Sequence, residues 1–221
     1  MRFSLFASLS LSLACASASV LATPAAPTPA QVTAAIQQFE AERIKQLEQT
    51  DPAAAERARS PVIATLVASI KAHAVKGCLP ASAGEIVCIV GVQAGLRDGY
   101  RALAFRDNPE PWVLVRRETP DVNGPNAAQA TAAMREFARA ELKKNPSGEH
   151  AAELTSMAES LVVKQLNHCG LNRDSGNFGC DAMISVGGAP EKRVSGFAFA
   201  LEPAGWQIGR ASCRERVYVL V

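Results

Sequence analysis

The chain has 221 residues, of which 48% are hydrophobic and 5% aromatic, and its 23 Lys and Arg against 21 Asp and Glu give a formal net charge of +2. A chain so close to neutral and so poor in aromatic residues has neither the basic stripe nor the stacking platform of a nucleic-acid-binding protein, so we expect no nucleic-acid partner. After its first residues, no stretch approaches the ~20 consecutive apolar residues of a membrane-spanning helix, and no membrane span is expected.

Residues 1–22 have the pattern of a secretory signal peptide. Arg2 provides a basic start, an apolar run follows, and Val20-Leu21-Ala22 fits a small-x-small cleavage site. The alternative is a lipoprotein signal with Cys15 as the acylated residue, which is disfavoured because Ser12 stands where such signals normally carry leucine. We therefore expect an exported, periplasmic protein.

The body of the chain contains one pattern twice. Each copy begins with six matching residues and continues with two cysteines, an Ala-Phe pair and a tryptophan. Such a duplication predicts two similar domains, at residues 23–118 and 119–206. The matching residues are Gln31, Thr33, Ala34, Ala35, Ile36 and Phe39 in the first copy and Gln129, Thr131, Ala132, Ala133, Met134 and Phe137 in the second.

Each copy is predicted to begin with helices. Thr28, followed by Pro29 and then Gln31, is typical of a helix start with a capping box, and Asn126 with Gln129 repeats the signal. Ser60-Pro61 indicates a further helix, whose apolar stripe we expect to be buried: Ile63, Leu66, Val67 and Ile70. Its counterpart in the second copy is marked by Leu154, Met157, Leu161 and Leu166.

After the helices, the apolar residues alternate with a period of two. Cys180, Ala182 and Ile184 share one face of residues 178–186, which predicts a half-buried antiparallel strand. Residues 86–93 form the equivalent strand, and turn signals lead from each into a further strand and then a strand that begins at tryptophan. The expected class is α+β, with each copy made of helices followed by a four-stranded antiparallel meander.

The cysteine pattern predicts one disulfide per domain. Cys15 belongs to the signal and Cys213 to the C-terminal tail, so two pairs remain, and the economical pairing in an oxidising compartment is Cys78 with Cys88 and Cys169 with Cys180. A four-cysteine zinc site is the alternative, but it usually needs cysteines two to four residues apart. We therefore expect no metal.

The last residues of the chain resemble a translated oligonucleotide. Ile208–Val217 matches, residue for residue, the translation of a sequencing-adapter oligonucleotide, so we expect residues 207–221 to be non-native; an ordinary basic tail is the alternative. Without Arg2 and the three arginines of the tail, basic residues fall from 23 to 19, and without Glu215 acidic residues fall from 21 to 20. The apparent positive charge then becomes a near-neutral body.

The element order resembles the cystatin-like and nuclear-transport-factor-2-like (NTF2-like) folds, in which a helix lies across a curved antiparallel sheet. The resemblance covers both copies and extends to the paired cysteines and the tryptophan of the last strand. It does not carry over protease inhibition, because the Gln-x-Val-x-Gly loop of cystatins has no match in this chain. NTF2-like enzymes place tyrosine and aspartate in an apolar pocket, and Tyr100 is the single tyrosine of the body.

Catalytic motifs are sparse. The three histidines, His73, His150 and His168, stand in no recognisable catalytic spacing, no nucleophile elbow, phosphate loop or His-Glu-x-x-His is present, and no cofactor is implied. Whether the protein is an enzyme stays open, with a noncatalytic role favoured.

The best candidate site is the strand face opposite the cysteine in the first copy. Val87 and Ile89 make this face apolar, whereas Gly179 and Asp181 stand there in the second copy. The face should be covered by the second domain or the long helix, or else by an unknown protein or a small apolar ligand, with Tyr100 nearby. The function expected is that of an exported, noncatalytic binding or interaction protein; the alternatives are a structural accessory protein of the cell envelope and a small-molecule enzyme of the NTF2-like type.

Overall fold

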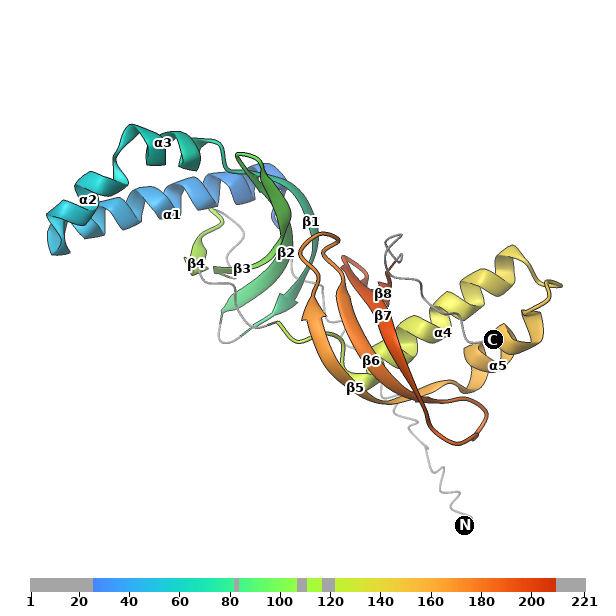
Figure 1. Cartoon of the computed structure of the whole chain (residues 1–221). Coiled ribbons are helices and arrows are strands. Elements are labelled where there is room, and N and C mark those ends of the chain that lie inside the picture. The colour runs from blue at the N-terminus through green and yellow to red at the C-terminus, as the bar shows by residue number, and fades with distance from the viewer. Residues whose placement is uncertain (1–25, 82–83, 107–110, 117–121, 210–221) are drawn as a thin grey trace, which may run out of the picture.

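The computed structural model describes residues 26–81, 84–106, 111–116 and 122–209. They form two units, each with helices that precede a four-stranded antiparallel sheet, which confirms the predicted α+β class (Figure 1). The predicted signal peptide, residues 1–22, and residues 210–221 of the tail lie outside the described residues. The first unit comprises α1 (Pro29–Thr50), α2 (Pro52–Ala58), α3 (Pro61–Ala68), β1 (Lys71–Pro80), β2 (Glu85–Ala94), β3 (Arg97–Arg106) and β4 (Leu114–Arg116). The second comprises α4 (Ala127–Lys144), α5 (Ala151–Ser160), β5 (Val162–Leu171), β6 (Phe178–Ser185), β7 (Lys192–Glu202) and β8 (Gly205–Ile208).

The long helix of each unit starts where its cap predicts. The Thr28 hydroxyl accepts from the Gln31 backbone N–H at 3.3 Å, and the Gln31 side chain accepts from the Thr28 backbone at 2.8 Å. Asn126 and Gln129 make the same reciprocal pair, at 2.9 Å in both directions. Both capping boxes are thereby confirmed, and each satisfies two backbone donors that a helix start leaves open.

Both sheets are meanders in chain order, β1-β2-β3-β4 and β5-β6-β7-β8. Cys78 pairs directly with Cys88 across β1 and β2 and forms a disulfide with it, and Cys169 and Cys180 form the second disulfide between β5 and β6. The predicted pairing is confirmed, and the zinc alternative is wrong because all four sulfurs are in disulfides.

The first unit has a core of its own between α1 and one face of its sheet. Alternate residues of β2 point towards this helix, and the disulfide lies among them. The buried members of this cluster are Val32, Ala35, Ile36, Cys78, Ile86, Cys88, Val90, Leu103, Phe105, Trp112 and Leu114.

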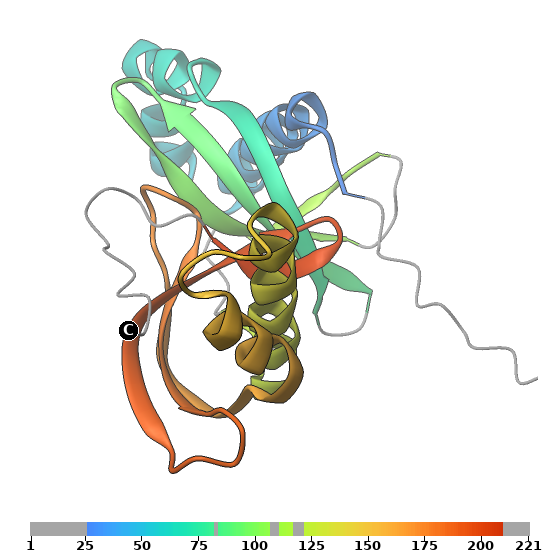
Figure 2. The same cartoon turned by 90° about the vertical axis from the view of Figure 1, so that its right-hand side faces the viewer.

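A second hydrophobic cluster extends through both units. It combines the core between α4 and the second sheet with the opposite face of the first sheet. From the first unit come Val87, Ile89, Ala102 and Ala104, and from the second come residues that include Met134, Phe178, Phe199 and Leu201. The units have separate sheets, yet they are joined by a continuous core; Figure 2 shows the two sheets crossing at this junction.

Two details of the first unit differ from expectation. None of the residues of α3 is buried, and Leu66 is 48% exposed, so the prediction of a buried stripe is wrong for this helix, although Ile70 just after it packs against the core of the first unit. α2, which the sequence pattern did not indicate, packs along α1 instead. The hairpin turn lies at Gly95-Leu96 and β3 begins at Arg97, whereas Arg97-Asp98-Gly99 has the residue pattern of a turn. In the second unit, Leu166 lies in β5 and not in a helix.

Candidate functional site

The predicted site face of the first sheet lies at the junction of the two units. Val87 and Ile89 are 6% and 0% exposed, within the cluster that takes in Met134 and Phe178 of the second unit. These β-branched side chains are therefore covered, as expected, and what covers them is the hydrophobic core that the two units share. A ligand has no open access to Val87 and Ile89 in this arrangement.

Glycines allow the two units to approach each other closely. A Cβ on Gly77 of β1 would lie 2.9 Å from Leu201 Cγ and 3.0 Å from its carbonyl oxygen on β7. A Cβ on Gly99 of β3 would lie 3.0 Å from the Arg173 carbonyl oxygen. Side chains at these two positions would push the backbones apart, which gives both glycines a role at the junction.

A loop of the second unit caps the open edge of β3. β4 pairs with β3 only at Ala104 and Phe105, among the described residues, so the earlier part of β3 has a vacant edge. There the Tyr100 N–H donates to the Arg173 carbonyl at 2.6 Å, and Lys76 Nζ donates to the side-chain oxygen of Asn177 at 3.0 Å. The loop between β5 and β6 thus satisfies a backbone donor of β3 that a fourth strand would have satisfied.

Tyr100 contacts residues of both units at this junction. Its ring is in edge contact with the His73 ring, with centroids 6.0 Å apart, and Lys76 Nζ lies 5.1 Å from the ring centroid. Gly176 of the second unit lies so close that a Cβ there would be 2.6 Å from the tyrosine ring. The predicted binding residue Tyr100 therefore serves at least to hold the units together.

His73 and Asp98 form a pair beside Tyr100. His73 Nε2 lies 2.8 Å from Asp98 Oδ1, across the intervening strand β2. Gly91 makes this possible, because a Cβ at Gly91 would lie 2.5 Å from the His73 ring. The side chains are 41% and 64% exposed, so the pair lies at the surface, where such ion pairs contribute little stability.

A pocket of about 520 Å³ opens where α1, the β2–β3 hairpin and the Arg173 loop meet. We call it the junction pocket. Apolar and charged side chains both line it. The apolar lining includes Ile36, Ile70, Val92, Leu103 and Leu114, and the charged lining comprises Glu40, Arg97, Asp98, Arg101, Arg173 and Asp174.

The arginines of the junction pocket come from both units. Arg97 and Arg101 lie on the same face of β3 as Leu103, and Arg173 comes from the second unit. Two of the three acids already bind other side chains: Asp98 binds His73, and buried Glu40 binds Arg43 at 2.9 Å. The pocket lining therefore combines guanidinium groups from both units with apolar side chains.

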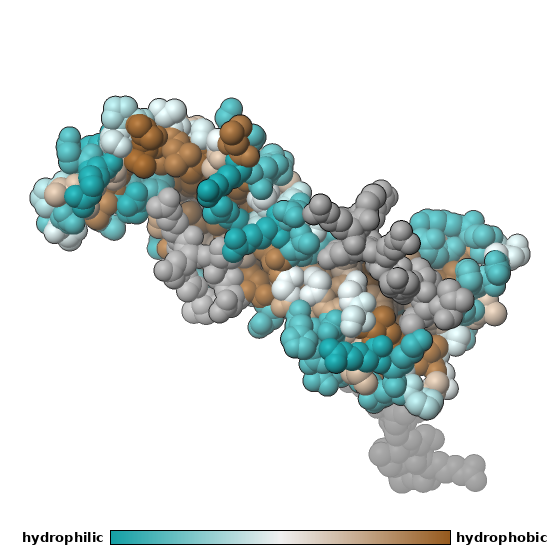
Figure 3. Space-filling view, in the orientation of Figure 1, coloured by the Kyte–Doolittle hydropathy of each residue, from teal (hydrophilic) through white to brown (hydrophobic). Residues whose placement is uncertain are grey.

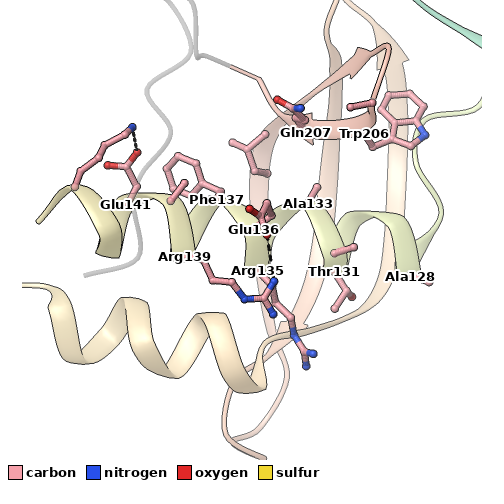
Figure 4. Close-up of a pocket in the computed structure, with 15 residues that line it drawn as sticks. Ala128, Thr131, Ala133, Arg135, Glu136, Phe137, Arg139, Glu141, Trp206 and Gln207 are labelled. Atoms are coloured by element: carbon pink, nitrogen blue, oxygen red, sulfur yellow. Dashed lines mark hydrogen bonds and ion pairs between the residues drawn. The ribbon is translucent and has the colours of Figure 1, made fainter. Parts of the chain in front are cut away.

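A larger groove of about 1030 Å³ lies between α4 and β8 (Figure 4). Its α4 wall presents small alanines, 39% exposed Phe137, and the ion pairs Arg139–Glu136 and Lys144–Glu141. Trp206 and Gln207 of β8 lie opposite α4 in Figure 4. Because Gln207 and Ile208 of this wall fall in the segment expected to be non-native, we do not assign a function to this groove.

The described residues hold no group of three or more His, Cys, Asp or Glu that could bind a metal ion. In the same part of the chain, no helix has the length and apolar content that crossing a bilayer requires. Comparisons of the chain with protein-family models, with curated proteins and with solved structures find no match.

The sequence pointed to Tyr100 near the site but not to the arginines around it. Arg97 stands in a turn-like Arg-Asp-Gly stretch, and Arg173 lies in a loop with no motif around it. The signal that could have identified Arg101 is its position on the same strand face as Leu103 and Phe105, which are buried.

Proposed function

We propose that this protein is an exported, noncatalytic binding protein that holds a small amphipathic anion in the junction pocket. The observation that carries the proposal is the combination of an apolar wall with arginines from both units. An alkyl or aryl group would pack on Ile36, Leu103 and Leu114, and a carboxylate or sulfonate would reach the guanidinium groups. The expected small apolar ligand is thereby refined to one with a negative end.

The second unit supports this assignment because it lacks the arginine. Cys88 and Cys180 are equivalent disulfide positions, so Val90 is equivalent to Ala182. Val90 pairs with Arg101, whereas Ala182 pairs with Val194. The same sheet position is charged in one unit and apolar in the other, so the fold itself does not require Arg101.

Export of the protein and the fold family of its two units are predictions from the sequence that this proposal includes. The signal-like residues 1–22 and the two disulfides support export to an oxidising compartment. The likeness of each unit to cystatin-like and NTF2-like domains stays a prediction from element order. Ligands in α+β folds of this kind would lie between the helix and the sheet, and the junction pocket borders that space in the first unit.

The test is a fluorescent fatty-acid analogue, dansylaminoundecanoic acid, titrated into the chain from residue 23 onward. We expect saturable binding that an unlabelled alkyl carboxylate displaces. The double variant Arg101→Gln/Arg173→Gln should weaken probe binding at least about tenfold, because each lost charge-assisted contact is worth roughly 1.5 kcal/mol or more.

A matched control removes two positive charges elsewhere. Lys164→Gln/Lys192→Gln alters exposed lysines of the second sheet that do not line the junction pocket and should bind the probe like wild type. Equal weakening by the two double variants, or no saturable binding by wild type, would refute the proposal.

A further inference from the structure

An apolar ridge stands at the surface of the first unit. Val62 and Leu66 of α3 are 77% and 48% exposed, and Leu96 in the β2–β3 turn is fully exposed. We call these three side chains the apolar ridge. Figure 3 shows hydrophobic atoms gathered over α3 and again at the neighbouring hairpin turn, with hydrophilic side chains around them. Single exposed apolar residues are ordinary, but several on adjacent elements indicate a contact surface.

A hydrogen bond brings the two parts of the ridge together. The Gly95 N–H, next to Leu96, donates to the hydroxyl of Ser69 at the end of α3, at 3.2 Å. The bond has an exact counterpart in the second unit, where the Gly187 N–H donates to the Ser160 hydroxyl at 2.8 Å. These serines and glycines therefore align the two copies residue by residue.

The aligned positions of the second unit are not a ridge. Counted from the paired serines, Val62 corresponds to Glu153 and Leu66 to Met157; counted from the paired glycines, Leu96 corresponds to Gly188. α5 also packs on α4, with Ala158 buried, whereas α3 has no buried residue. At these three aligned positions the second copy exposes no large aliphatic side chain, so the ridge is a property of the first copy.

The segment that carries α3 is basic. Residues 57–71 contain three basic residues and no acidic one, whereas the aligned residues 148–162 contain three acidic residues and no lysine or arginine. The basic residues are Arg57, Arg59 and Lys71, which lie at the two ends of α3, and Arg97 follows Leu96. Arg59 pairs with Glu48 of α1. Beside Leu96, Asp98 follows Arg97 but binds His73. Basic side chains therefore flank the apolar side chains at both parts of the ridge.

We propose that the apolar ridge docks the protein onto an anionic lipid surface. Val62, Leu66 and Leu96 would enter the interfacial region of the bilayer, and the neighbouring basic side chains would bind lipid phosphates. A second copy fits the surface less well, because a two-fold contact through the ridge would bring Arg57, Arg59 and Lys71 of both copies together. The apolar ridge and the basic side chains beside it together match an anionic bilayer, which has an apolar interior and negatively charged headgroups.

The experiment is flotation of the chain from residue 23 onward with vesicles of phosphatidylglycerol and phosphatidylcholine in equal parts. We expect binding that declines with added salt and is weak on vesicles of phosphatidylcholine alone. The variant Val62→Ser/Leu66→Ser/Leu96→Ser should lower the partition coefficient at least about tenfold, since it removes the apolar side chains that would enter the bilayer. All three positions are exposed, so the variant should keep the wild-type circular dichroism spectrum and melting temperature.

The control replaces an exposed apolar residue of the second unit. Val162 is 36% exposed at the start of β5, and Val162→Ser should bind vesicles like wild type. Wild-type protein that does not float with anionic vesicles, or a triple variant that floats equally well, would overturn the proposal. A third outcome would also overturn it. If the wild-type protein does not bind vesicles but forms a dimer in sedimentation velocity, and the triple variant is a monomer, the ridge is a self-association surface.

Discussion

Thr131 Oγ1 accepts a hydrogen bond from the backbone N–H of Val163 at 2.9 Å and so joins the first turns of α4 to the start of β5. The same bond joins Thr33 to the Ala72 N–H in the first unit, also at 2.9 Å. Each threonine hydroxyl in turn donates to the carbonyl four residues earlier in its helix. The duplication is thus kept at the level of individual atoms, in a contact that sets where the helix lies on the sheet.

Replacement of Thr131 by valine should destabilise the protein by about 1–3 kcal/mol. Valine keeps the shape but leaves the N–H of Val163, a residue that is 3% exposed, without its acceptor. Urea unfolding followed by circular dichroism measures the change. Thr131→Ser retains the hydroxyl and should be closer to wild type; a serine variant as unstable as the valine variant would show that the methyl group, and not the hydrogen bond, matters.

The helix starts and the strand pairs were predictable because their signals are local. Thr28 with Gln31 and Asn126 with Gln129 form the capping boxes that their spacing indicates, and the repeated cysteine positions indicate the cross-strand disulfides. Thr33 and Thr131 stand out in the repeat, yet their role depends on where a distant strand begins, which no local pattern shows.

The sequence could not predict which element packs against an apolar face. The stripe of α3 is apolar, but periodicity does not tell how far another element covers it, and among the described residues none of its side chains is buried. For Val87 and Ile89 the apolar pattern correctly required a cover, but the cover is formed in part by residues such as Met134 and Phe178, distant in the chain. Arg173 reaches the junction pocket through tertiary packing alone.

Peptide mapping without reduction should show Cys78 linked to Cys88 and Cys169 linked to Cys180. The half-cystines are separated by 10 and 11 residues, and closing loops of this size stabilises a folded chain by roughly 3 kcal/mol in the chain-entropy model. The double variant Cys169→Ala/Cys180→Ala should therefore lose about that much in urea unfolding. A peptide that links Cys78 to Cys169 would contradict the two-unit arrangement.

Ile89→Ala should weaken both units, whereas Ile86→Ala should weaken chiefly the first. Both isoleucines are buried in β2, but Ile86 belongs to the core under α1 and Ile89 to the core shared with the second unit. Each truncation should cost about 2–5 kcal/mol. Hydrogen exchange with mass spectrometry distinguishes the two: Ile89→Ala should lower protection in α4 and β6 as well as in the first sheet. Identical exchange patterns for the two variants would mean that the units are not coupled through this face.

The carboxyl group of Asp181 should respond to the loss of Arg193. Arg193 Nη2 lies 2.9 Å from Asp181 Oδ2, and this hydrogen bond is the largest cause that holds the pKa of Asp181 below its ordinary value of 3.8, with Ser195 and His168 adding to it. A carboxyl whose pKa is lower in the folded than in the unfolded chain stabilises the fold above the unfolded value, and this contribution is lost as the pH falls through the folded value. Arg193→Gln should therefore raise the pKa of Asp181 towards 3.8 and make the stability of the protein depend less steeply on pH at acidic pH.

A carbon-detected NMR titration of the Asp181 carboxyl measures this pKa directly. The control is Lys192→Gln, which removes a neighbouring charge that makes no bond to Asp181 among the described contacts. An unchanged pKa in Arg193→Gln, or an equal shift in both variants, would show that the hydrogen bond from Arg193 is not what lowers it.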